Sequence, residues 1–236
     1  MSEPVRIALV GATGLVGGEL MKLCVGRSDV RLVAVARREA PMPPGARMEM
    51  FVADPDKWGE VFEAIRPAAL VCALGTTWRK AGRDEAAFRA VDHDLVLATA
   101  RAAKEQGVAN LVAVSSAGAD PRSKMFYFRV KGETERELQK LRFKRLDILR
   151  PGLLRGPRSG DRRIGERLAI LASPLADLFL QGRFEAYRSI NAALVAKAAL
   201  ALAMRKAAGR FVHDNAAILR AAASLSYLHS DDRVPH

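Results

Sequence analysis

Cysteine is scarce in this sequence, with only Cys24 and Cys72 among 236 residues. Two cysteines do not make a disulfide framework, and they fit a reducing compartment as small buried side chains. The apolar run 192–204 is interrupted by Lys197 and is too short to cross a bilayer. No signal-peptide layout precedes the first apolar segment. We therefore expect a cytoplasmic protein without a membrane span.

Acidic residues and histidines are also few. The four histidines have no spacing suited to a metal site, so no metal is predicted. The sequence has 26 acidic and 38 basic residues, which gives a net charge of +12. This charge suggests an anionic partner, but no nucleic-acid recognition motif accompanies it, and we expect no nucleic acid to bind. Nine basic and only two acidic residues fall between 140 and 163, and this cluster needs a local explanation.

The chain has no internal repeat and no low-complexity linker, and half of its residues are apolar. Segments typical of strands and helices alternate, which predicts a parallel sheet with helices on both faces. The predicted strands are 5–10, 31–36, 48–53, 69–74, 110–115, 145–149 and 210–212. The predicted helices are 15–25, 56–65, 84–106, 126–141, 164–179, 190–206 and one beginning at 215.

These elements indicate an α/β fold, a Rossmann-type doubly wound parallel sheet with a small C-terminal substrate cap. We predict a single domain over 1–236. Within it, 1–150 forms the nucleotide-binding core, and 151–236 supplies the cap and completes the sheet. Ligands of such sheets bind at the carboxyl ends of the strands.

A glycine-rich turn follows the first predicted strand directly. Glycines at such a turn permit a tight bend and a close approach of the backbone to a pyrophosphate, and the following helix offers free N–H groups. The alternative is a glycine turn without a ligand. The residues predicted to contact the cofactor here are Gly11, Thr13, Gly14, Leu15, Val16 and Gly17.

The end of the second predicted strand discriminates between the two nicotinamide cofactors, because an acid there binds a ribose hydroxyl and an arginine accommodates a 2′-phosphate. Arg37 and Arg38 precede the first acid, Glu39, so we predict NADP(H) over NAD(H). The alternative is two solvated loop arginines. Further predicted cofactor contacts are Asp54, Leu74, Gly75, Thr76, Ser115, Lys131 and Pro151.

A serine pair, a tyrosine and a lysine carry the predicted chemistry. Tyr127 and Lys131 are four residues apart in a predicted helix and share one face. A phenol can supply the proton that a carbonyl oxygen needs during reduction, and a nearby ammonium stabilises the phenolate. A serine hydroxyl at a strand end, from Ser115 or Ser116, can bind the developing oxyanion. The alternative makes the tyrosine a packing residue and the lysine a surface charge.

Together with Arg150-Pro151-Gly152, these motifs resemble the extended and atypical short-chain dehydrogenase/reductases over nearly the whole chain. Segments 72–77, 80–82, 91–92, 115–120 and 130–133 look more closely like the branch of the HIV Tat-interacting protein and its bacterial relatives. The resemblance implies NADPH binding on a Rossmann-type sheet, with Tyr127 as acid/base and Lys131 on the ribose. It implies Ser116, or Ser115, as the residue that orients the substrate. The helix asparagine of many extended members is missing from 91–94.

Basic residues also follow the fourth and sixth predicted strands. Arg79, Arg83 and Arg155 are candidates to bind a substrate, and together with the 140–163 cluster they favour an anionic carbonyl compound. The alternative is a set of solvated basic loops.

Three functions remain open at this point. The first is an NADPH-dependent oxidoreductase that acts on a small carbonyl or alcohol substrate, and the second is a cofactor-sensing regulator of a protein partner with little turnover. The third is a nucleotide-sugar epimerase, which the short cap and the arginine pair disfavour. Helices 84–106 and 126–141 could form the face of a homodimer.

Overall fold

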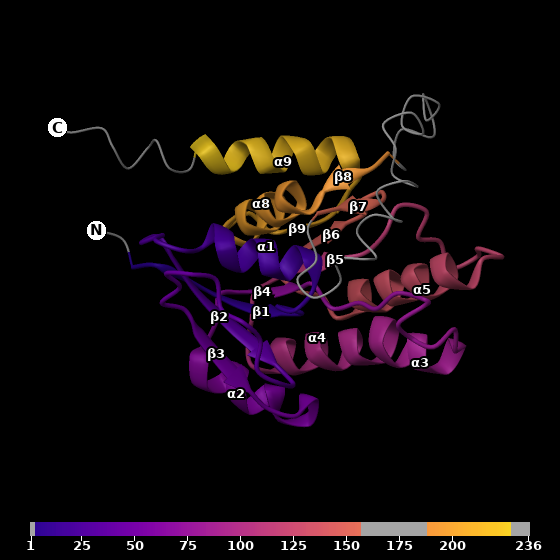
Figure 1. Ribbon diagram of the computed structural model, residues 1–236, viewed down its shortest axis with the longest axis horizontal. Coiled ribbons are helices and arrows are strands. Elements are labelled where there is room, and N and C mark those ends of the chain that lie inside the picture. Colours follow the sequence, from indigo (N-terminus) through magenta and orange to yellow (C-terminus); the bar gives the residue numbers. More distant parts are fainter. Residues whose placement is uncertain (1–2, 157–187, 228–236) are drawn as a thin grey trace.

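The computed structural model describes residues 3–156 and 188–227. Seven parallel strands form one sheet in the order β3-β2-β1-β4-β5-β6-β9 (Figure 1). The strands are β1 (Val5–Val10), β2 (Val30–Ala36), β3 (Glu49–Val52), β4 (Ala69–Cys72), β5 (Asn110–Val114), β6 (Arg145–Leu149) and β9 (Gly209–His213). Their central members are almost continuously aliphatic because helices cover both faces of the sheet. The predicted doubly wound α/β fold is confirmed.

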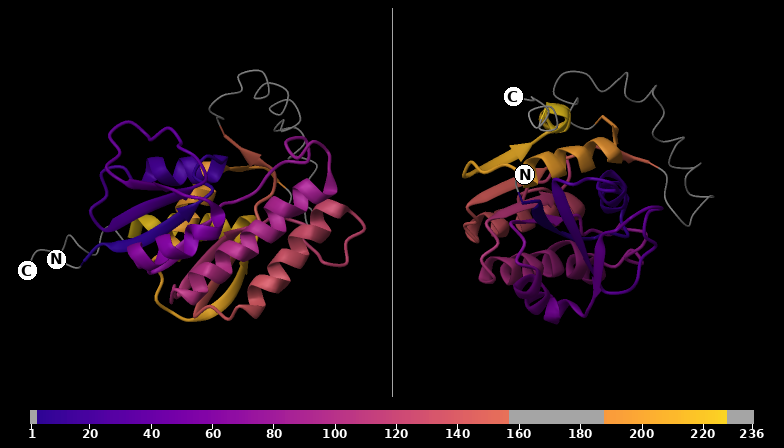
Figure 2. Two further views of the ribbon diagram at one scale, coloured as in Figure 1. Left: turned by 90° about the horizontal axis from the view of Figure 1, so that it is seen from below. Right: turned by 90° about the vertical axis from the view of Figure 1, so that its left-hand side faces the viewer.

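One face of the sheet packs against α2 (Trp58–Ile65), α4 (Val96–Glu105) and α5 (Phe126–Lys140). The opposite face packs against α1 (Leu15–Leu23) and α8 (Ala192–Ala203), and α9 (Asn215–Tyr227) lies over α8 (Figure 2). Helix α8 is enclosed between the sheet, α1 and α9, which explains why it is apolar on nearly all sides. No helix among the described residues is both long and apolar enough to cross a membrane.

The helix predicted over 84–106 contains an irregularity that the sequence does not reveal. It runs as α3 (Glu85–Arg89), a π-helical segment (Ala90–Leu95) and then α4. Gly107 follows with a φ of 77°, as expected for the end of a helix. The wider turn at Ala90–Leu95 brings Asp92 into the interior, where it is 1% exposed.

The described part of 151–227 completes the sheet. β9 pairs with β6, and two-residue strands β7 (Leu154–Arg155) and β8 (Ile190–Asn191), which the sequence did not predict, pair with each other. The predicted helix 164–179, and with it much of the predicted cap, lies outside the described residues. The division into core and cap stays a prediction.

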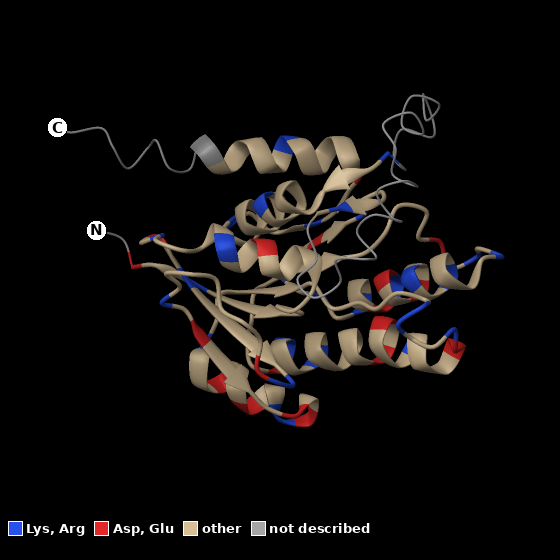
Figure 3. Ribbon diagram, in the orientation of Figure 1, with Lys and Arg blue, Asp and Glu red and all other residues tan. Residues whose placement is uncertain are grey.

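The basic cluster between 140 and 163 does not gather at one end of the sheet. β6 begins at Arg145 and ends at Leu149, so Lys140, Arg142 and Lys144 precede the strand, at the edge opposite its carboxyl end. Arg145 is itself buried and ion-paired with Asp147. Figure 3 likewise shows Lys and Arg spread over many elements. The prediction that this whole cluster surrounds the substrate cleft is wrong, because the residues before β6 lie at the opposite edge of the sheet. Arg158, Arg162 and Arg163 of the cluster lie outside the described residues.

Candidate active site

The glycine turn lies between the carboxyl end of β1 and the start of α1. Gly11 has a φ of 86°, and a β-carbon there would overlap the backbone of Ala73 and Leu74, so only glycine fits. A β-carbon on Gly17 would overlap the carbonyl oxygen of Gly11. The absence of a side chain at Gly17 therefore lets α1 pack tightly against the turn. Gly14 is the N-cap of α1 and provides no side-chain cap, so N–H groups of the first turn are available to an anion.

The other predicted cofactor contacts lie along the same edge. Arg37 and Arg38 follow the carboxyl end of β2 and are exposed, as is Thr13 in the glycine turn. Asp54 follows β3 and is also exposed. β2 is adjacent to β1, and β3 is adjacent to β2, so these side chains lie on the β2 side of the glycine turn.

Lys131 is held inside the molecule by a residue that the sequence analysis did not assign. Its Nζ lies 2.7 Å from Oδ1 of Asp92, and the two side chains are 8% and 1% exposed. The second carboxylate oxygen of Asp92 accepts a hydrogen bond of 2.7 Å from the backbone N–H of Thr76. Asp92 therefore ties α5 to the loop after β4.

The loop after β4 contains the predicted cofactor contacts Leu74, Gly75 and Thr76, and it passes close to the Asp92–Lys131 pair. A β-carbon on Gly75 would lie 3.4 Å from Oδ1 of Asp92 and 3.8 Å from Nζ of Lys131. The lysine ammonium is thus next to the backbone predicted to face the ribose, and it has three donors of which Asp92 takes one.

The charge of Lys131 depends on Asp92. Burial by itself disfavours the ammonium form, but the charge and hydrogen bond of Asp92, together with the charges of Tyr127 and Cys72, outweigh it, so the pKa of Lys131 lies above its ordinary value. The lysine is therefore a cation at neutral pH. The signal that could have identified Asp92 is its position in 91–94, where the family resemblance implies a polar helix residue near the lysine.

The two serines after β5 have different surroundings. The hydroxyl of Ser115 donates a hydrogen bond to Glu135, a buried residue on α5. Glu135 is also held by Arg150, whose Nε lies 3.0 Å from each carboxylate oxygen. Within the described ranges 3–156 and 188–227, the hydroxyl of Ser116 donates one local hydrogen bond, to the carbonyl of Ala117.

Pro151 is buried and acts through its backbone. Its carbonyl accepts a hydrogen bond of 2.8 Å from the N–H of Ala117, and this joins the loop after β6 to the loop after β5.

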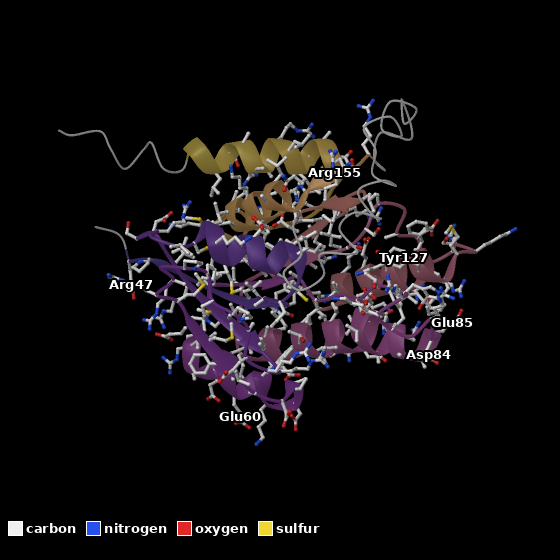
Figure 4. All side chains as sticks on the ribbon, in the orientation of Figure 1. Arg47, Glu60, Asp84, Glu85, Tyr127 and Arg155 are labelled. Atoms are coloured by element: carbon white, nitrogen blue, oxygen red, sulfur yellow. The ribbon has the colours of Figure 1, made fainter. Side chains whose placement is uncertain are left out.

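Tyr127 is half-buried near the start of α5 and belongs to a group of aromatic rings. Its ring centroid lies 5.5 Å from that of Phe88 and 5.3 Å from that of Phe128. In the view of Figure 4, Tyr127 is seen between the start of α3, marked by Asp84 and Glu85, and the β7 region, marked by Arg155.

The predicted substrate arginines lie in two separate places. Arg79 and Arg83 are exposed in the loop between β4 and α3, whereas Arg155 is exposed at the end of β7. Among the described residues, no group of three or more His, Cys, Asp or Glu side chains is arranged to hold a metal.

Comparison with known proteins identifies the class of ligand. A family model described as NAD(P)H-binding matches residues 11–206. Protein FMP52, mitochondrial, of Saccharomyces cerevisiae is 39% identical over 160 residues, which is 66% of this chain and 69% of that protein. The protein of the same name from Candida albicans is 32% identical over 203 residues, which is 84% of this chain and 87% of that protein.

The names of these relatives bear on two predictions, the cellular location and the branch of the family. They are named as mitochondrial proteins in several fungi, so the expectation of a cytoplasmic location is contradicted. They carry the FMP52 name, and the closer resemblance to the Tat-interacting branch stays a prediction.

Solved structures resemble the fold at low sequence identity. MoeE5 in complex with UDP-glucuronic acid and NAD has a TM-score of 0.68 and 18% identity over 88% of this chain and 75% of that one. UDP-glucose 4-epimerase from Thermotoga maritima has a TM-score of 0.67 and 14% identity over 98% of this chain and 84% of that one. At these identities the likeness shows the Rossmann-type fold alone.

The described residues fit a dinucleotide. Gly11 and Gly17 let the turn pack directly against the backbone of the loop after β4 and of α1, and the start of α1 has no acidic residue in its first turn. The chain therefore belongs to the NAD(P)H-binding family, and it resembles the fungal FMP52 proteins in sequence.

Proposed function

We propose that this protein is an NADP(H)-dependent oxidoreductase of the short-chain dehydrogenase/reductase type that acts on a carbonyl or alcohol substrate. The observation that carries the proposal is the buried Lys131, held by Asp92 beside Gly75 and Thr76 and one helical turn from Tyr127. A packing role for the lysine would not need a buried ammonium next to the cofactor loop, because burying a charge is costly.

Each residue then has a separate task. A nicotinamide cofactor, when bound, would supply the hydride for reduction. Tyr127 donates its phenolic proton to the carbonyl oxygen as negative charge develops there. Lys131 keeps one donor on Asp92 and directs its remaining donors to ribose hydroxyls and the tyrosine oxygen.

The serine that contacts the substrate is assigned to Ser116. Ser115 already donates its proton to Glu135, which Arg150 holds in place, so its hydroxyl is committed to the scaffold. In the part of the chain that the structure describes, Ser116 donates to the neighbouring carbonyl of Ala117, and this local bond could be exchanged for one to an oxyanion.

Preference for NADP(H) is the finer part of the proposal. Exposed guanidinium groups on Arg37 and Arg38, at the end of β2, would bind a 2′-phosphate by charge-assisted hydrogen bonds. In a binding titration, NADPH should bind more tightly than NADH, and Arg37→Ala should remove most of the difference. Arg101→Ala, an exposed arginine on α4, is the matched control. Equal affinities of the wild type for both cofactors would refute the preference.

An anionic group on the substrate would be bound by the exposed basic residues of the strand-end loops. We expect Arg79→Ala and Arg83→Ala to raise the KM of a carboxylated aldehyde while leaving that of its uncharged analogue unchanged. If both KM values stay the same, these arginines are solvated loop residues.

The decisive experiment is a screen of carbonyl compounds with NADPH, comparing the wild type with Tyr127→Phe. The substitution should abolish turnover and retain cofactor binding, since the phenol acts on the substrate. Cofactor binding by the wild type without turnover of any compound would overturn the enzyme assignment. It would support a sensor that controls a protein partner.

A further inference from the structure

Three large apolar side chains are exposed on the loops that follow three neighbouring strands. Trp78 follows β4 and is 39% exposed, Met125 follows β5 and is 61% exposed, and Leu153 follows β6 and is 44% exposed. β4, β5 and β6 are adjacent in the sheet, so these loops leave the same stretch of its carboxyl edge. This is the edge at which doubly wound sheets bind their ligands.

Trp78 is connected to the proposed proton donor through stacked rings. Its centroid lies 5.7 Å from that of Phe126, Phe126 lies 5.8 Å from Phe88, and Phe88 lies 5.5 Å from Tyr127. Phe88 is completely buried and anchors the group. Rings at these separations make favourable edge and tilted contacts, so Trp78 has a defined place near the tyrosine.

The fold does not require these exposed side chains. Neither Trp78, Met125 nor Leu153 belongs to the two hydrophobic cores of the described residues. The other exposed large apolar residues of the described chain lie elsewhere: on the edge strands β3 and β9, on α9, and at Met42 in the connection before β3. Exposed apolar side chains on the loops of the ligand-binding edge are typical of a surface that contacts an apolar ligand.

We propose that the substrate is a carbonyl compound with a bulky apolar body, aromatic or branched, which lies against Trp78, Met125 and Leu153 while its oxygen meets Tyr127. This rests on the proposed function and adds the class of substrate to it. Burial of an aromatic ring against these side chains favours such a substrate over a short polar aldehyde. The basic residues of the same loops then contact only the outer end of the molecule.

The first test compares rates of NADPH-dependent reduction. Cinnamaldehyde and benzaldehyde are compared with acetaldehyde and glyoxylate, using the wild type and Trp78→Ala. We expect the aromatic aldehydes to be reduced with a kcat/KM at least about tenfold higher than the short ones, and Trp78→Ala to remove most of that preference. Phe51→Ala, which truncates an aromatic residue on the edge strand β3, should leave the preference unchanged.

A second measurement does not depend on turnover. The chain has two tryptophans, and Trp58 is buried with its indole N–H bonded to the carbonyl of Ala53, so only Trp78 can report on an exposed site. In the complex with NADP⁺, benzyl alcohol should change the tryptophan fluorescence saturably, whereas ethanol at the same concentration should not.

The outcomes separate the two proposals. Tyrosine-dependent turnover with equal or greater activity on acetaldehyde and glyoxylate would overturn the apolar substrate and keep the oxidoreductase. Saturable binding of benzyl alcohol without any turnover would support the apolar site and count against the enzyme assignment. Absence of both the preference and the fluorescence change would refute the inference.

Discussion

Replacement of Asp92 by asparagine tests whether the buried ion pair holds the site together. Asparagine has the same shape and can still accept the hydrogen bond from the N–H of Thr76. It removes the carboxylate charge that faces Lys131 at 2.7 Å. The lysine is then a buried cation without a counter-charge.

The expected loss in the free energy of unfolding follows from the burial of the pair. Both side chains are less than a tenth exposed, and loss of one member of a buried pair destabilises a protein by about 3–5 kcal/mol. The contribution is present at neutral pH and is lost as the pH rises through the raised pKa of Lys131. Without Asp92, burial dominates and the pKa of Lys131 falls below its ordinary value, so the variant also loses activity at a lower pH than the wild type does.

Urea unfolding at neutral pH, monitored by circular dichroism, measures the loss in the free energy of unfolding. The control is Glu49→Gln, which breaks an exposed pair with Arg31 and should cost less than about 1 kcal/mol. A double variant, Asp92→Asn with Lys131→Met, should recover much of the lost stability, because neither charge is then buried alone. If Asp92→Asn costs no more than the control, or if the double variant is less stable than the single one, the reasoning is refuted.

Three further predictions concern the rest of the described chain. Gly17→Ala should lower the free energy of unfolding by about 1–3 kcal/mol and weaken cofactor binding, because the new methyl overlaps the carbonyl oxygen of Gly11; a variant with wild-type stability and affinity would contradict this. Burial raises the pKa of Cys24 to about 12 and of Cys72 to about 11, so neither thiol should react with a disulfide reagent at pH 8 until the protein is unfolded in urea; prompt labelling of the native protein would disagree. Glu135→Gln should reduce stability by about 1–3 kcal/mol and leave the affinity for NADPH unchanged, and a selective loss of cofactor affinity would point to a different role.

The helix that contains Asp92 shows a feature that hydrophobic periodicity does not predict. The periodicity of 84–106 predicts a helix, and one is present over 85–105. A single wide turn within it changes which side chains face inward, and periodicity has no means of signalling it. Asp92, which lies in that turn, contacts Thr76 and Lys131, and both partners are distant in sequence.

The roles of two neighbouring serines also cannot be assigned from the sequence. Ser115 and Ser116 are equivalent in any motif, and the sequence left both as candidates. Only the position of Glu135 on α5, itself held by Arg150, distinguishes them, because Glu135 accepts the hydrogen bond of Ser115. Arg145 illustrates the same point for charge, because it contributes to the basic count and yet is buried against Asp147.

Patterns of neighbouring residues are enough to predict the parallel α/β architecture, the glycine turn and the tyrosine–lysine spacing, because local sterics and periodicity govern each of them. Contacts between distant elements determine which charges are paired, which serine donates to Glu135 and which apolar side chains stay exposed at the edge of the sheet. These properties depend on distances between elements far apart along the chain.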